Sequence, residues 1–245
     1  IYTDGQGDNP LAIQDAAGND ANSLLRGIVA DGYIRNAAIY IDANEDGIAQ
    51  ASEYTGVTTD RDGTFVLAHW DPAKPVLAVG GVNIDTGVPN TLTLSTRAGA
   101  MVLSPLTTLV TQLMRKQGLS AEAANDRVAA ALALSTGVEL SLYDPLAANT
   151  DTSVAIQKIA AKVATLAMEV AKDSNEQAAL LQALALKLSG QSSPVDLTDE
   201  LFIGHVLHDA GLAATPLELA TLSDTLGHIA QAGTLTGISK AHALA

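Results

Sequence analysis

The sequence predicts an α+β chain in which a small antiparallel β-sandwich is followed by an all-α helical bundle domain. Short apolar runs bounded by Gly, Asp, Asn or Pro occupy the region 27–99, and such runs are typical of strands. From residue 100 onward, apolar residues recur every three or four positions, which is the period of an amphipathic helix. This change of period predicts two domains, a sandwich over 27–99 and a helical domain over 100–245.

The segment 1–26 is expected to be an extended lead-in or linker. It is rich in Gly, Asp and Asn and has few periodic apolar residues. Its polar residues Asp4, Asp8 and Asn9 either contribute to cation binding or belong to a disordered end, and we favour the disordered end.

The sandwich is predicted from four short runs that are rich in β-branched and apolar residues. Each run is bounded by residues that favour turns, which is the pattern of antiparallel strands. The expected strands are 37–41, 64–68, 75–79 and 91–95.

The helical domain is predicted to contain five or six helices. Ser104 before Pro105 has the order of an N-cap and a first-turn proline, and Gly118 is a stop signal. A second helix follows Ser120. Further helices are expected near Ser174, Thr198 and Thr215, where Thr215-Pro216-Leu217-Glu218 has the spacing of a capping box.

The third helix should have one buried and one exposed face. Its buried stripe includes Ile156 and Val163, whereas Lys158, Lys162 and Thr165 repeat on another face that we expect to contact water.

Composition excludes several classes of function. The net charge of −14 argues against binding nucleic acid, because phosphate contacts require clustered Lys and Arg. No apolar run approaches the ~20 residues that a membrane span needs. The chain has no cysteine, so disulfides and thiolate chemistry are excluded. Because aromatic residues make up only 3 % of the chain, its core must consist of Ala, Leu, Val and Ile.

One acidic motif stands out. Residues 42–53, DANEDGIAQASE, match the twelve-position calcium-loop pattern D-x-[DN]-x-[DN]-G-x₅-E. Ca²⁺ is a hard ion that takes six to eight oxygen ligands, and short acidic or amide side chains at alternate positions supply them. The expected metal ligands are Asp42, Asn44, Asp46, the Ile48 carbonyl, Gln50 and Glu53. The β-branched and aromatic residues before Asp42 indicate that the loop leaves a strand rather than a helix. The alternative is a solvated hairpin without metal.

Two further groups of residues are weaker candidates for metal sites. Asp60 and Asp62 either help to bind a second calcium ion, complete the first calcium site or form a plain turn, and the turn is favoured. His205 and His208 are three residues apart on one helical face and could hold zinc if His228 came near. Ordinary surface histidines explain this pair better, because no H-E-x-x-H arrangement supplies a general base.

Four segments carry a resemblance to a known family. Residues 31–42 read DGYIRNAAIYID and lead into the acidic loop, and residues 58–65 read TTDRDGTF. Together with the loop they resemble the calcium-dependent B-type sandwich modules of bacterial surface adhesins. Residues 99–110, GAMVLSPLTTLV, and 143–147, YDPLA, are similar to the helical part of large secreted bacterial proteins, including repeats-in-toxin-type adhesins.

The resemblance covers roughly residues 27–170 and implies an extracellular or cell-surface location, in a biofilm matrix for example. Gln50 replaces the acid that the family usually has at that position of the loop. The segment 175–245 carries no resemblance.

The sequence therefore predicts a non-enzymatic, calcium-stabilised structural or adhesive module, whose partners are neighbouring modules or copies of itself. The host or matrix ligand is not indicated. One alternative is a subunit of an extracellular filament that adds its N-terminal segment as a strand to a neighbour's sheet. Another is a metal-assisted hydrolase, for which the sequence offers no convergent acid, base and nucleophile.

Overall fold

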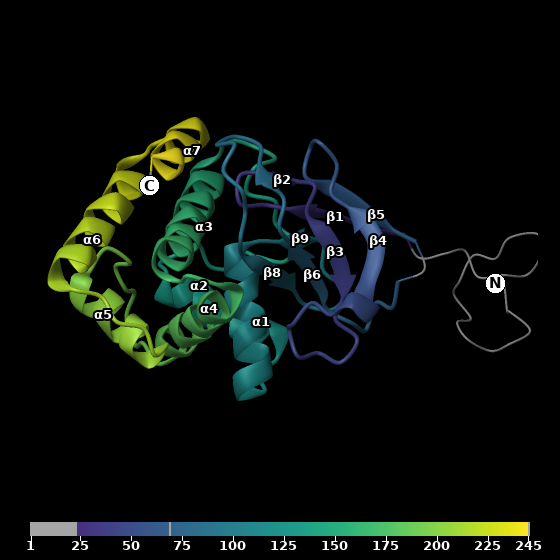
Figure 1. Cartoon of the computed structure of the whole chain (residues 1–245), viewed down its shortest axis with the longest axis horizontal. Coiled ribbons are helices and arrows are strands. Elements are labelled where there is room, and N and C mark those ends of the chain that lie inside the picture. The colour runs from purple at the N-terminus through teal and green to yellow at the C-terminus, as the bar shows by residue number, and fades with distance from the viewer. Residues whose placement is uncertain (1–23, 69, 245) are drawn as a thin grey trace, which may run out of the picture.

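A computed structural model describes residues 24–68 and 70–244 of the chain. The chain is α+β, with the strands first and the helices after them, as the sequence predicts. Figure 1 shows the strands on one side of the molecule and most helices on the other, with α1 between them. Most of the expected lead-in, including Asp4, Asp8 and Asn9, lies outside the described residues.

The strands form three small sheets with the orders β5-β1-β9, β2-β7 and β4-β3-β6-β8. All pairs are antiparallel except β1 and β9, which are parallel and differ in this from the expected arrangement. The strands are β1 (Leu25–Val29), β2 (Ile34–Arg35), β3 (Ala38–Ile41), β4 (Tyr54–Thr58), β5 (Thr64–Leu67), β6 (Val76–Val79), β7 (Val82–Asn83), β8 (Thr93–Thr96) and β9 (Val102–Leu103).

The four expected strands correspond to β3, β5, β6 and β8, each within two residues of the expected bounds. The other strands were not expected. Three of them, β2, β7 and β9, are only two residues long, and such short pieces have no measurable period. β1 begins at Leu25, two residues before the expected start of the sandwich, and β9 lies beyond its expected end.

Seven helices follow the strands within the described part of the chain, where five or six were expected. They are α1 (Pro105–Gln117), α2 (Ala121–Ala131), α3 (Asp151–Val170), α4 (Ser174–Ser189), α5 (Glu200–Asp209), α6 (Pro216–Gln231) and α7 (Leu235–Ala243). The short helix α7 was missed.

The predicted signals at the ends of α1 are confirmed. The Ser104 side chain accepts a hydrogen bond from the Thr107 N–H, which would otherwise lack a partner at the first turn. Gly118 has a φ of +65°, and its N–H donates to the Met114 carbonyl. α6 likewise opens with the predicted capping box between Thr215 and Glu218.

The expectation that Lys162 and Thr165 lie on a face of α3 that contacts water is wrong. Lys162 and Thr165 are only 6 % and 2 % exposed, because this helix packs among α1, α4, α6 and α7. The Lys162 ammonium lies 4.0 Å from the Asp196 carboxylate, and its burial lowers the pKa of the lysine. A helix covered on several sides buries polar residues that a single periodic stripe would leave in water.

One buried apolar cluster runs through both parts of the molecule, from Leu25 in β1 to Leu226 in α6. α1 joins the two parts because it packs against β8 on one side and against α2, α3 and α4 on the other. Hydroxyl groups strengthen this junction: the Thr108 hydroxyl accepts from the Ser95 N–H at 2.9 Å, and the Thr107 hydroxyl donates to the Ser95 carbonyl at 2.7 Å. The division into independent domains at residues 99 and 100 stays a prediction.

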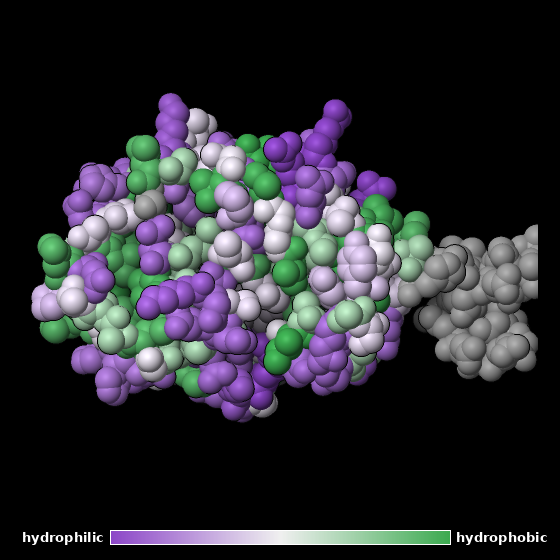
Figure 2. Space-filling model, viewed as in Figure 1, coloured by the Kyte–Doolittle hydropathy of each residue, from purple (hydrophilic) through white to green (hydrophobic). Residues whose placement is uncertain are grey.

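The surface mixes hydrophilic and hydrophobic residues, and Figure 2 shows them interspersed on the face in view. Among the helices that the structure describes, none has the length and apolar character that crossing a membrane requires.

Candidate metal centre

The acidic loop connects two neighbouring strands of the four-stranded sheet. β3 ends at Ile41 immediately before Asp42, so the predicted exit from a strand is confirmed. The loop closes with a short 3₁₀ turn, Ala51–Glu53, and β4 follows directly. Tyr40 of β3 pairs with Tyr54 of β4, and their ring centroids are 5.3 Å apart. Pairing of the two strands therefore holds the ends of the loop together.

Gly47 occupies the one loop position at which the motif requires glycine. Its φ of +75° is a conformation that residues with a side chain rarely adopt. A Cβ atom there would also collide with the Arg115 guanidinium, which lies directly against the glycine. The Gly47 N–H donates to Asp42 Oδ2 at 2.9 Å, so the turn folds back onto the first acid of the loop.

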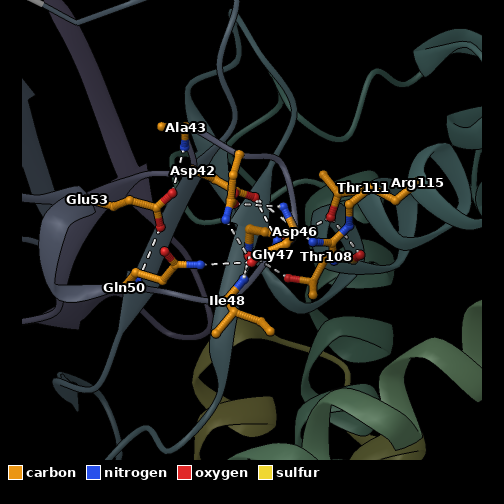
Figure 3. Close-up of polar contacts among 12 residues, drawn as sticks. Asp42, Ala43, Asp46, Gly47, Ile48, Gln50, Glu53, Thr108, Thr111 and Arg115 are labelled. Carbon is orange, nitrogen blue, oxygen red and sulfur yellow. Dashed lines mark hydrogen bonds and ion pairs between the residues drawn. The ribbon is translucent and has the colours of Figure 1, made fainter.

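Asp42 is the most deeply placed acid of the loop, with 1 % of its surface exposed. Its Oδ1 atom is buried and has no hydrogen-bond partner among the described residues. Arg115, which extends from α1 toward the loop in Figure 3, brings its Nη1 atom to 4.0 Å from Asp42 Oδ2. Burial raises the pKa of Asp42, whereas the Gly47 N–H and the positive charge of Arg115 lower it.

Asp46 is the central acceptor of the loop. Its Oδ1 atom accepts the Ile48 N–H at 2.7 Å, and its Oδ2 atom accepts the side-chain amide of Gln50 at 2.9 Å (Figure 3). The side-chain amide of Asn44 also donates to Oδ2 at 2.9 Å. The Asp46 N–H donates in turn to Asn44 Oδ1 at 3.1 Å. A rotation of either amide would present an oxygen in place of the NH₂ group. Gln50 is therefore able to serve as a neutral oxygen donor where the adhesin pattern has an acid.

Glu53 ties the two ends of the loop through its carboxylate. Its Oε1 atom accepts the Ala43 N–H at 2.9 Å, and its Oε2 atom accepts the Gln50 N–H at 3.2 Å (Figure 3). Both oxygens thus accept backbone N–H groups of the loop. Bidentate binding of a cation would replace these two hydrogen bonds.

The structure brings all six predicted ligand residues into one loop, but it does not bring their carboxylates together. Across the parts of the chain that are described, no three His, Cys, Asp or Glu side chains form a group that could hold a metal ion. The donor set itself fits Ca²⁺, since it offers carboxylate, amide and carbonyl oxygens and no nitrogen or sulfur ligand. The orphaned Oδ1 atom of Asp42 is the buried oxygen that such an ion would satisfy.

The side chains of the two weaker candidates do not gather into clusters of three or more His, Cys, Asp or Glu residues in the described part of the chain. Asp60 accepts the N–H groups of Asp62 and Thr64, each at 2.9 Å, which is the arrangement of the favoured turn. His205 and His208 are exposed, and His208 lies 3.5 Å from the adjacent Asp209. The third imidazole, His228, instead pairs with Asp224 on its own helix at 3.8 Å.

Sequence reasoning missed the basic residues around the loop. Lys74 lies 2.8 Å from Glu45 and Arg115 lies near Asp42, although both basic residues are distant from the loop in the sequence. Arg115 carried one local signal, its place in the last turn of α1, but that signal predicts only a favourable interaction with the helix dipole.

Comparisons of this chain with protein-family models, curated proteins and solved structures found no match.

Proposed function

We propose that the chain is a non-enzymatic, calcium-stabilised structural module. Its acidic loop, residues 42–53, holds one Ca²⁺ through the side chains of Asp42, Asn44, Asp46 and Glu53 and the carbonyl of Ile48, with Gln50 ligating directly or through water. The strand region acts as a sandwich and the helices act as a bundle that is rigidly attached to it.

The observation that carries this proposal is that Asp42 is buried and that its Oδ1 atom has no hydrogen-bond partner among the described residues. A buried carboxylate oxygen without a partner costs free energy, because burial removes its hydration and nothing replaces it. The Arg115 guanidinium offsets only part of this cost, because its Nη1 atom lies 4.0 Å from Asp42 Oδ2, which is beyond hydrogen-bond distance. A divalent cation held by the loop would supply the missing partner and neutralise the repulsion among Asp42, Asp46 and Glu53.

The expected gain in stability follows from mass action. An extracellular-type site has a dissociation constant of about 10⁻⁴–10⁻³ M. At ten times that concentration, binding stabilises the folded state by about 1.4 kcal/mol. For a chain of this length the melting temperature should rise by about 3–6 °C.

Thermal melting of the whole chain tests this prediction. The chain is stripped with chelator and melted in excess chelator, in millimolar calcium and in millimolar magnesium at equal ionic strength. We expect calcium to raise the melting temperature and magnesium to do so far less, because Mg²⁺ gives up its water shell reluctantly. Equal melting temperatures in calcium and in chelator would contradict the proposal.

An extracellular bacterial setting, with neighbouring modules or copies of the chain as partners, forms part of the same proposal. It is supported by the resemblance of residues 27–170 to adhesin modules and by a charge of −14, which suits an environment rich in cations. The acidic loop joins two strands of one sheet, so that calcium would stiffen this sheet rather than activate a substrate.

A further inference from the structure

A pocket lies beside the acidic loop, between the loop, the end of β8 and the last turn of α1. Its volume is about 340 Å³, within the range of small-molecule sites. Asp42 and Glu45 form part of its wall, and it is also lined by Arg97, the residue after β8, and by Arg115 of α1. Met114 and Leu119 contribute apolar surface. The pocket therefore combines an apolar wall with two guanidinium groups.

Both guanidinium groups have few partners. Arg97 lies 3.7 Å from Glu139 through Nε and donates from Nη1 to the Ala98 carbonyl at 3.1 Å. Among the residues that the structure describes, the ion pair with Asp42 at 4.0 Å is the only polar contact of the Arg115 side chain. In each arginine the Nε atom is buried and has no hydrogen-bond partner within the described ranges. A planar guanidinium presents a fork of N–H donors that matches a carboxylate, so this pair of arginines suits an organic acid.

The charges around the pocket depend on whether the loop holds a cation. Without one, the positive charges of Arg97, Arg115 and Lys74 are balanced by their acidic partners Glu139, Asp42 and Glu45. A calcium ion would add two positive charges at one edge of the pocket. The ion would also bind the Asp42 carboxylate. Arg115 would then lack its acidic neighbour, and its N–H groups would be free to donate to another anion.

We propose that this pocket binds a small organic carboxylate with an apolar body, and that it does so when calcium fills the loop. The carboxylate contacts Arg97 and Arg115, and the apolar body lies along Met114 and Leu119. This inference rests on the proposed calcium site. The module would then respond to two ligands together, since each ligand strengthens the binding of the other by the same factor.

Nuclear magnetic resonance of methyl-labelled methionine tests the inference on the whole chain. Met114 lies in the pocket, while Met101 and Met168, the other two methionines, do not line it and serve as internal references. Sodium hexanoate is titrated in calcium and in chelator, with hexanamide as the neutral probe of equal shape. We expect a saturable shift of the Met114 signal with hexanoate, about 5-fold tighter or more in calcium, and none with hexanamide.

An Arg115→Gln variant separates a binding role from a structural one. It should weaken hexanoate binding by about tenfold or more, because charged hydrogen bonds are lost. Its calcium binding should be equal or tighter, because a positive charge near the ion is removed. A variant that merely misfolded would lose both ligands. Arg61→Gln is the matched control, since Arg61 is exposed on a turn, and it should bind both ligands as the native chain does.

The outcomes distinguish the two proposals. If calcium binds but hexanoate leaves Met114 unchanged, or binds equally well in chelator, the inference is wrong and the calcium module stands. The same holds if hexanamide binds as well as hexanoate or if Arg115→Gln has no effect. If calcium itself fails to bind, the proposed function fails and the inference fails with it.

Discussion

An Asp42→Asn variant should bind calcium with an affinity about 10–100-fold lower, while its calcium-free form stays folded. Asp42 is the first ligand of the loop, and calcium affinity falls steeply as charged ligands are removed. The amide oxygen would still accept the Gly47 N–H, so the turn keeps its internal hydrogen bond. The substitution removes a buried and incompletely paired charge, but it also takes from Arg115 its acidic neighbour, so the two effects on stability in chelator oppose each other.

Calorimetric titration of calcium into the stripped chain measures this effect. The matched control is Asp62→Asn, which removes the same charge from an exposed turn residue with 69 % of its side chain in solvent. The control should bind calcium with native affinity. Native affinity in Asp42→Asn would show that any calcium heat comes from the general acidity of the chain rather than from the loop.

A Leu109→Ala variant should be destabilised by about 2–5 kcal/mol. Leu109 is fully buried in α1, the helix that packs between β8 and the other helices. Truncation would leave a cavity that neighbours on both sides can fill only in part. Because one apolar cluster runs from β1 to α6, the strands and helices should be lost in the same transition.

Two probes follow this unfolding. Trp70, the single tryptophan, reports on the strand region by fluorescence, and far-ultraviolet circular dichroism reports mainly on the helices. Leu217→Ala provides the control, since Leu217 is 77 % exposed and its truncation should change stability by about 0.5 kcal/mol or less. If Leu109→Ala affected only the circular dichroism signal and left Trp70 native, residues 27–99 would be an independent domain, as the change of period predicts.

The sequence predicted those features of the fold that depend on a few adjacent residues, such as the ends of helices. Ser104 caps α1 and Gly118 ends it with a positive φ, because both effects depend on a few adjacent residues. Four strands, β3, β5, β6 and β8, were predicted for the same reason, although the two longest, β1 and β4, were missed. Lys162 was placed wrongly because its burial depends on four other helices that cover α3, and no local period contains that information.

The candidate site shows the same limit. The loop, its exit from β3 and the role of Gly47 were predictable from twelve consecutive residues and their flanks. Arg97 follows β8 and Arg115 belongs to α1, and both line one pocket with Asp42 because α1 packs against that sheet. The pocket that they line could therefore not be predicted from the sequence.

A crystal structure of the chain grown in millimolar calcium tests the central claim most directly. We predict one anomalous scatterer in the loop, with oxygens of Asp42, Asp46 and Glu53 about 2.3–2.6 Å away, which are the usual calcium–oxygen distances. Asp42 Oδ1 should be among them. A well-ordered loop that retains the Ala43–Glu53 and Ile48–Asp46 hydrogen bonds in abundant calcium, with no ion, would contradict the account.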